Sequence, residues 1–172
     1  EYYGVDVDII CCGKAVSGAL PLSAVLSKKE IIDVDGSLNS THGGSPLPCA
    51  SALANLKYME KHHLVEEAKR KETIIRNKFI QMKALFPERI CAVHGMGMAF
   101  AAVVVKPQTR ELDVELVDRI IERAYEKGLM SIRTMTGTIK IGPPLTIPDD
   151  ALEEGMDILI EAMKEIVREV KC

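Results

Sequence analysis

The order of strand-like and helix-like segments in the second half of the chain places the strongest constraint on its fold. Four short apolar segments have the composition of strands, and two longer amphipathic segments have the spacing of helices. Their order is strand, strand, helix, strand, strand, helix, which is typical of an α+β domain whose antiparallel sheet has helices on one face. The expected strands are 90–93, 98–105, 130–135 and 138–141, and the expected helices are 114–127 and 148–170.

Glycine-containing segments should form the turns of this sheet. His94-Gly95-Met96-Gly97 separates the first two expected strands, and Thr136-Gly137 separates the other two. Gly128 should end the helix between the two strand pairs, with Lys127 in the last turn, where a positive charge suits the helix dipole.

The first half of the chain predicts a small part of a sheet followed by two long helices. The first of these helices has an apolar stripe, and the second has an apolar stripe opposite a densely charged face. The short strands before them look like the remnant of a larger sheet. In chain order we expect strands at 9–12 and 23–27, a helical turn at 28–34, and helices at 46–61 and 64–85.

Composition excludes several classes of function. The chain has 172 residues, a net charge of −3 and charges of both signs, which argues against a nucleic-acid surface. No apolar run approaches the length of a membrane span. The five cysteines show no metal-ligand spacing, so we expect no metal site and interpret them as small buried residues of a reducing cytoplasm.

A lysine directly after an apolar strand is the first candidate for chemistry. The segment from Asp8 to Gly13 ends abruptly at the glycine, Lys14 follows, and Gly18 and Pro21 make the next stretch flexible. A buried or half-buried lysine beside a turn loses hydration and becomes a candidate for Schiff-base chemistry. The alternative is a surface lysine at the end of a strand.

A glycine-rich corner further along is the second candidate. Thr41 and two glycines precede Ser45, a suitable helix N-cap, and Pro46, a residue that fits the first helical position. A hydroxyl and a glycine turn that lead into a helix N-terminus can bind a phosphate group. A well-capped helix with no ligand is the alternative.

Three motifs, in this order along the chain, resemble those of class III aminotransferases of the ornithine and ω-amino acid type. The first runs from Ile9 to Ala24, with Gly-Lys followed by a glycine turn and Pro-Leu-x-Ala. The second runs from Thr41 to Ala50 and has Ser45 where the family has asparagine. The third is Lys-Ile-Gly-Pro-Pro-Leu-Thr-Ile, residues 140–147, and begins with lysine where the family usually has arginine.

This resemblance implies a pyridoxal 5'-phosphate enzyme of fold type I. Residues 1–61 would be the end of the large cofactor-binding domain, and 62–172 would be the small C-terminal α+β domain with its antiparallel sheet covered by helices. Lys14 would form the Schiff base with the cofactor and later move the substrate proton. Thr41 would reach the cofactor phosphate in the neighbouring subunit of a homodimer, whose active site lies at the interface.

The same resemblance gives Lys140 a role in binding the substrate carboxylate. Arginine grips a carboxylate with a planar fork, whereas lysine offers only a point charge. Arg133, on the preceding expected strand, is a second candidate for this role. A lysine that merely solubilises an edge strand is the alternative for Lys140.

The resemblance also implies that parts of the cofactor site are missing. The family places its ring-stacking aromatic residue, its aspartate for the pyridine nitrogen and its phosphate loop before the region matched by residue 1. We therefore expect an enzyme fragment that is inactive alone, from a cytoplasmic aminotransferase acting on an amino donor and a 2-keto acid. Two alternatives stay open: an amino-acid racemase or epimerase of the same family, and a non-catalytic fragment that only folds and associates.

Overall fold

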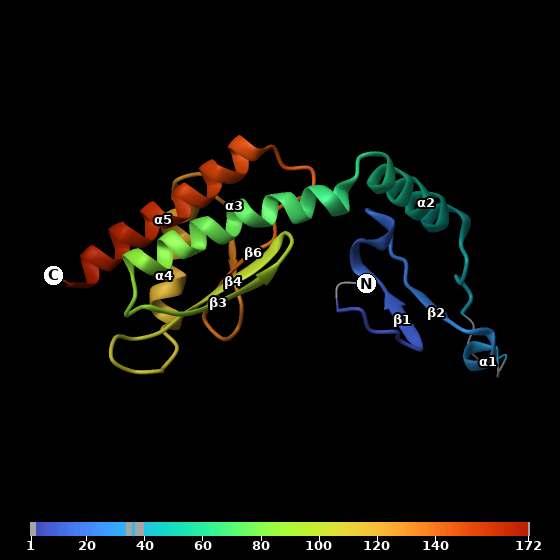
Figure 1. The fold of residues 1–172 in the computed structure, drawn as a ribbon, viewed down its shortest axis with the longest axis horizontal. Coiled ribbons are helices and arrows are strands. Elements are labelled where there is room, and N and C mark those ends of the chain that lie inside the picture. Colours follow the sequence, from blue (N-terminus) through green and yellow to red (C-terminus); the bar gives the residue numbers. More distant parts are fainter. Residues whose placement is uncertain (1–2, 34–35, 37–39, 172) are drawn as a thin grey trace. The chain divides into compact units, whose positions relative to one another are not determined.

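The structure divides into two compact units. A computed structural model describes residues 3–33, 36 and 40–171. Unit 1 spans Glu1–His63 and unit 2 spans Leu64–Cys172 (Figure 1). This division falls two residues after the boundary expected from the sequence.

Unit 1 is built from a two-stranded sheet and a helix. Strand β1 pairs antiparallel with β2, in a register that places Ile10 opposite Leu26 and Cys11 opposite Val25. The expected helical turn at 28–34 is a single short helix, and residue 34 lies outside the described residues. The elements are β1 (Ile9–Cys12), the 3₁₀ helix η1 (Lys14–Ser17), β2 (Ala24–Ser27), α1 (Lys29–Ile32) and α2 (Pro46–Lys61).

Unit 1 has almost no hydrophobic core of its own. Of its described residues only Ser17 and Ala52 are buried. Ile10 and Leu26 lie on one face of the two-stranded sheet and Val25 on the other, and all three side chains are about half exposed. The apolar stripe expected along α2 is exposed as well. Both faces of the sheet are therefore uncovered in the described chain.

The same exposure corrects the interpretation of the cysteines. Cys11, Cys49 and Cys91 are exposed and Cys12 is half-buried, so the prediction of small buried residues was wrong for these four; Cys172 lies outside the described residues. Cys11 is exposed because nothing in the described chain covers its face of β1, and Cys49 lies in the exposed first turn of α2.

Unit 2 confirms the α+β order expected from the sequence. Its four strands form one antiparallel sheet in the order β3-β4-β6-β5, and three long helices complete the unit (Figure 1). The helix at 64–85 has the predicted bounds. The elements are α3 (Leu64–Leu85), β3 (Ile90–Met96), β4 (Ala99–Val104), α4 (Val114–Glu126), β5 (Ile132–Arg133), β6 (Thr138–Ile141) and α5 (Asp149–Lys171).

Two details of the sheet differ from the expectation. Residues 94–96 belong to β3 and not to a turn, because Gly95 pairs with Phe100 within the ladder. A Cβ atom at Gly95 would lie 2.3 Å from Cγ of Phe100, so this glycine makes room for an aromatic ring. Strand β5 is two residues long because the following residues form a turn, in which the Gly137 amide donates to the Thr134 carbonyl at 3.1 Å.

The helices of unit 2 cover one face of its sheet. Phe100, Ala102 and Val104 are buried on that face, and they alternate along β4 with less buried residues. Phe79 of α3 stacks on Phe100, with ring centroids 6.0 Å apart. The sheet residue Ile139 and the α4 residue Ile120 are fully buried in the same cluster. Burial of this one face supplies the main stabilisation of the unit.

Replacement of Phe79 by alanine should destabilise unit 2 strongly. The ring is fully buried, so its removal leaves a cavity and should lower the free energy of unfolding by about 3–5 kcal/mol. The neighbouring Ile80 is 59% exposed, and Ile80→Ala should change that free energy by less than about 1 kcal/mol. Urea unfolding followed by circular dichroism measures both variants, and equal losses would contradict this account of the core.

Candidate functional site

Lys14 occupies a strained position at the end of β1. It follows Gly13, begins η1 and has a φ of +50°, which places a lysine in the left-handed region. This conformation costs on the order of 1 kcal/mol for a residue with a Cβ atom. The residue is exposed, which agrees with the alternative of a surface lysine at the end of a strand and not with a buried or half-buried one. The side chain is thus accessible at the start of η1.

Helix α2 holds the turn that carries Lys14. The Ser51 hydroxyl donates to the Ser17 carbonyl at 2.7 Å. One helical turn later, the Asn55 amide nitrogen donates to the carbonyls of Ala15 at 3.1 Å and Val16 at 3.3 Å. Two side chains of α2 therefore bind three successive carbonyl groups of the 3₁₀ turn.

The turn itself is closed by hydrogen bonds within it. The buried Ser17 hydroxyl donates to the Leu20 carbonyl, and the Gly18 amide donates to the Ala15 carbonyl at 3.0 Å. Gly18 has a φ of +77°, and a Cβ atom there would lie 3.4 Å from Asn55. Glycine is therefore suited to this position both by its backbone and by the approach of α2.

Sequence reasoning missed Ser51 and Asn55. They are polar residues spaced four apart on a helix that is otherwise rich in alanine and leucine, and this spacing places them on one face. That pattern was the available signal. The carbonyl groups that Ser51 and Asn55 bind could not be predicted, because these hydrogen bonds depend on the backbone conformation of a turn that is distant in the sequence.

Thr41 lies in an exposed turn just before α2. The Gly43 amide donates to the Ser40 carbonyl at 2.9 Å, and the Ser45 amide donates to the His42 carbonyl at 3.1 Å. Gly44 has a φ of +68°, so the chain needs a glycine there to enter the helix. Thr41 therefore lies at the helix entrance, as expected, with its side chain accessible.

The N-terminus of α2 offers few donors to an anion. Pro46 and Pro48 have no amide hydrogen, and the Cys49 amide donates to the Ser45 carbonyl. Ser45 occupies the N-cap position, but its side chain makes no capping hydrogen bond. A phosphate group at this corner would therefore depend on the Thr41 hydroxyl more than on the helix.

Lys14 and Thr41, both among the described residues, are not joined by a hydrogen bond. Each is connected to α2 separately, Lys14 through the side chains that bind its turn and Thr41 through the chain that enters the helix.

The substrate-binding candidates of unit 2 lie on opposite faces of its sheet. Lys140 is exposed and opposite Ala101 and Ile132, on the face that the helices leave open. Arg133 is opposite Ile139, on the covered face, and forms an ion pair with Asp118 of α4. The structure therefore does not bring the two cations together.

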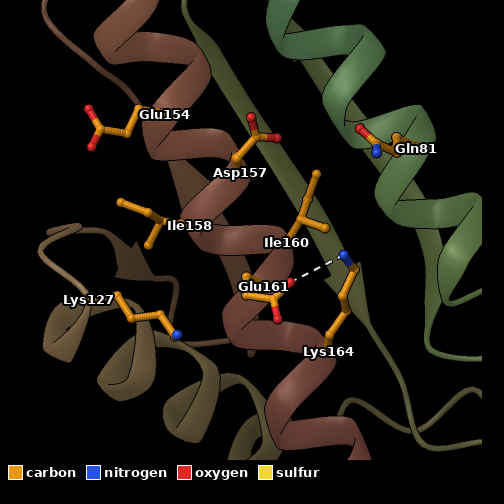
Figure 2. Close-up of a pocket in the computed structure, with 8 residues that line it drawn as sticks. All are labelled: Gln81, Lys127, Glu154, Asp157, Ile158, Ile160, Glu161 and Lys164. Atoms are coloured by element: carbon orange, nitrogen blue, oxygen red, sulfur yellow. Dashed lines mark hydrogen bonds and ion pairs between the residues drawn. The ribbon is translucent and has the colours of Figure 1, made fainter.

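A pocket in unit 2 contains none of the candidate residues. It has a volume of about 710 Å³ and lies along α5, with Gln81 of α3 on one side and Lys127 on the other (Figure 2). Its charged groups are largely paired: Lys164 with Glu161 at 3.2 Å, and Lys127 with Glu165 at 2.6 Å. The pocket therefore offers little free charge to a ligand.

The described residues contain neither a metal cluster nor a membrane-spanning helix. In 3–33, 36 and 40–171, no three His, Cys, Asp or Glu side chains are grouped so that they could hold a metal ion. No helix in this part of the chain is both long and apolar enough to cross a membrane.

Comparison with known proteins decides the family. The model of the family described as aminotransferase class-III matches residues 1–163. The chain belongs to the class III aminotransferases. The 4-aminobutyrate aminotransferase of Mycobacterium tuberculosis is 35% identical over 167 residues, which are 95% of this chain and 37% of that protein. A leucine/methionine racemase of Thermococcus litoralis is 32% identical over 169 residues, 96% of this chain and 38% of that protein.

A solved aminotransferase structure agrees with the fold. The ornithine aminotransferase of Toxoplasma gondii, crystallised with partial occupancy of pyridoxal phosphate at its active site, has a TM-score of 0.87 and 26% identity. The match covers 98% of this chain and 39% of that one. The fold type I assignment is thereby confirmed, and pyridoxal phosphate is the cofactor of the class III family. The chain spans less than half the length of these relatives.

Replacement of Asn55 by alanine should loosen the turn that carries Lys14. The change removes two hydrogen bonds to carbonyl groups and should lower the free energy of opening the turn by about 1 kcal/mol. We expect the amides of Val16 and Gly18 to exchange with deuterium about fivefold faster, measured by NMR. Lys57→Ala, at an exposed position of α2, is the control and should leave the rates unchanged. Unchanged rates in Asn55→Ala would show that α2 does not hold the turn.

Proposed function

We propose that the chain is the C-terminal part of a pyridoxal-phosphate aminotransferase that transfers an amino group between an amine or amino acid and a 2-keto acid. The observation that carries this proposal is Lys14, a lysine with a φ of +50° on a turn whose carbonyl groups are bound by α2. A strained residue that its surroundings hold in place is typical of a functional site. Membership of the class III family supports the same reading.

In this proposal Lys14 supplies the reactive amine. Its Nζ atom would hold the cofactor through the cofactor's aldehyde group, and the free amine would take up and move the proton that leaves the substrate Cα. When bound, pyridoxal phosphate supplies an electron sink for the charge left by that proton. The exposed side chain fits this role, because the amine can reach a partner that the described chain does not provide.

Thr41 is proposed to bind the cofactor phosphate through its hydroxyl group. Its exposed position at the entrance to α2 supports this role. We further propose that it does so in the neighbouring subunit of a homodimer. In this arrangement each of two sites would use Lys14 of one subunit and Thr41 of the other.

Lys140 is the better of the two candidates for the substrate carboxylate. It is exposed on the open face of the sheet, whereas Arg133 would first have to leave Asp118. An ammonium group binds a carboxylate as a point charge and without the fixed fork of arginine. We therefore propose Lys140 as the substrate-side cation, with Arg133 as the second candidate.

The small amount of buried surface in unit 1 supports a role as part of a larger domain. An isolated two-stranded sheet is marginally stable, and here both faces carry half-exposed apolar side chains. We propose that residues 1–61 complete a cofactor-binding domain, that 62–172 form the small domain, and that this chain alone is inactive. The free cysteines among the described residues support a reducing, cytoplasmic location.

A racemase or epimerase is the second candidate function. The observation that favours it is the 32% identity to the T. litoralis racemase. Such an enzyme uses the same lysine and cofactor but returns the proton to the carbon from which it came, so no amino group leaves the substrate. The third possibility, a piece that only folds and associates, predicts that neither reaction depends on Lys14.

An isotope experiment separates transamination from racemisation. The longer protein that we propose contains this chain is loaded with pyridoxal phosphate and given ¹⁵N-labelled amino donors with 2-oxoglutarate. We expect ¹⁵N in the product glutamate and a keto or aldehyde product from the donor, both measured by mass spectrometry. If the donor changes its configuration and no ¹⁵N reaches glutamate, the transaminase proposal is wrong and the racemase is supported.

Replacement of Lys14 by alanine or arginine should abolish covalent attachment of the cofactor. Borohydride reduction followed by peptide mapping should place the label on Lys14 in the wild-type protein and on no specific residue in either variant. Lys14→Arg keeps the positive charge, so loss of the label in this variant would exclude a purely electrostatic role for Lys14. Lys28→Ala, at an exposed position before α1, should keep both the label and the activity. A wild-type level of label at another lysine in Lys14→Ala would contradict the assignment.

A further inference from the structure

A buried lysine in α3 stands apart from the proposed chemistry. Lys71 is only 5% exposed, although lysine is almost never buried without a partner. Its ammonium group donates to the Ile147 carbonyl at 2.6 Å and to the Leu145 carbonyl at 3.2 Å. Burial of an ammonium group is costly, so hydrogen bonds to both carbonyls offset a desolvation penalty that an apolar residue would avoid. A plain core position does not require this arrangement.

The residue beside Lys71 binds the same part of the chain. The Arg70 guanidinium donates two hydrogen bonds of 2.7 Å to Asp149, the first residue of α5, and is also paired with Glu67. Arg70, with a smaller contribution from the charge of Lys71, holds the pKa of Asp149 below its usual range. Successive residues of α3 therefore bind the chain at Leu145, Ile147 and Asp149.

The bound segment directly follows the strand that carries Lys140. Residues 142–147 lead from the end of β6 to α5, and their side chains alternate between exposed and half-buried positions. Leu145 and Ile147 lie against the core, and the Ile147 amide donates to the Pro144 carbonyl at 3.0 Å. Pro143 and Pro144 have no amide hydrogen, so the segment has few backbone donors with which to hold itself in place.

From this geometry we propose that Lys71 is a positioning residue for the substrate-side cation. It fixes residues 142–147, and through them the end of β6 and the backbone of Lys140. The inference rests on the proposed function, because it gives Lys140 the role of binding the substrate. A lysine side chain is flexible and lacks the planar fork of arginine. The strand fixes only the Cα atom from which this side chain extends, and Lys140 lies next to the last residue of β6, directly before the bound segment.

The test uses three variants of the chain and two independent measurements. Lys71→Met keeps the length of the side chain and removes its donors, Lys71→Arg keeps donors, and Lys78→Met is the control. Lys78 lies on the same helix and pairs with Asp157 of α5 at 2.6 Å. The Lys78→Met change therefore removes an ion pair between α3 and α5 and leaves the bonds of Lys71 in place. Circular dichroism first establishes that each variant is folded.

Hydrogen exchange of the Ile147 amide, which donates to the Pro144 carbonyl, is the first measurement and is recorded by NMR. We expect exchange about tenfold faster in Lys71→Met, a rate near wild type in Lys71→Arg, and no change in Lys78→Met. This readout needs neither cofactor nor activity. Unchanged exchange in Lys71→Met would overturn the proposal.

The second measurement is the kinetics of the complete, cofactor-loaded enzyme. We expect Lys71→Met to raise KM for the amino donor about fivefold, with kcat within about twofold of wild type and partial rescue in Lys71→Arg. Faster exchange with an unchanged KM would show that Lys71 only stabilises the segment, and would overturn its link to the substrate. If the wild-type enzyme transfers no amino group, the proposed function fails, and exchange alone decides whether Lys71 fixes the segment.

Discussion

Burial of one face of a four-stranded sheet organises the described structure of unit 2. Helix α3 reaches the sheet through the stacked rings of Phe79 and Phe100, and the ring of Phe100 fits only because Gly95 has no side chain. The opposite face stays open and carries Lys140. Ile139 of β6 is buried in this core, and the next residue of the strand, the candidate substrate cation, is exposed.

Unit 1 is held together by a different kind of interaction. Where unit 2 has a core, unit 1 has hydrogen bonds from Ser51 and Asn55 to the turn after Lys14. Hydrogen bonds depend on direction more than apolar contacts do, so they can hold a backbone in a conformation that packing alone would not select. This explains how a lysine keeps a positive φ with very few buried neighbours.

Elements with strong local signals were predictable from the sequence. Helix α2 begins at Pro46, as the Ser-Pro pair indicated, and α3 follows its apolar periodicity from Leu64 to Leu85. Gly95 was misread because a glycine required by a neighbouring ring looks the same in a sequence as a glycine required by a turn. Exposure of Cys11 was missed because burial depends on what covers a strand, and local sequence does not contain that information.

In the candidate site, too, residues in local motifs were predictable and contacts between distant residues were not. Lys14, Thr41 and Lys140 were found through motifs, whereas the α2 side chains that bind the Lys14 turn and the buried Lys71 depend on contacts between distant residues. The opposite orientations of Lys140 and Arg133 follow from strand register, because neighbouring residues along a strand point to opposite faces. The register became known only with the pairing of β5 and β6.

The uncovered hairpin of β1 and β2 has a consequence for any preparation of this chain. Two short strands with open edges and half-exposed Ile10 and Leu26 side chains provide a template for edge-to-edge pairing between molecules. Cys11, exposed on the same strand, can then link such pairs covalently once the solution becomes oxidising. Self-association and the loss of soluble material in storage should therefore begin at the strand that precedes Lys14, while the helix-covered sheet stays folded.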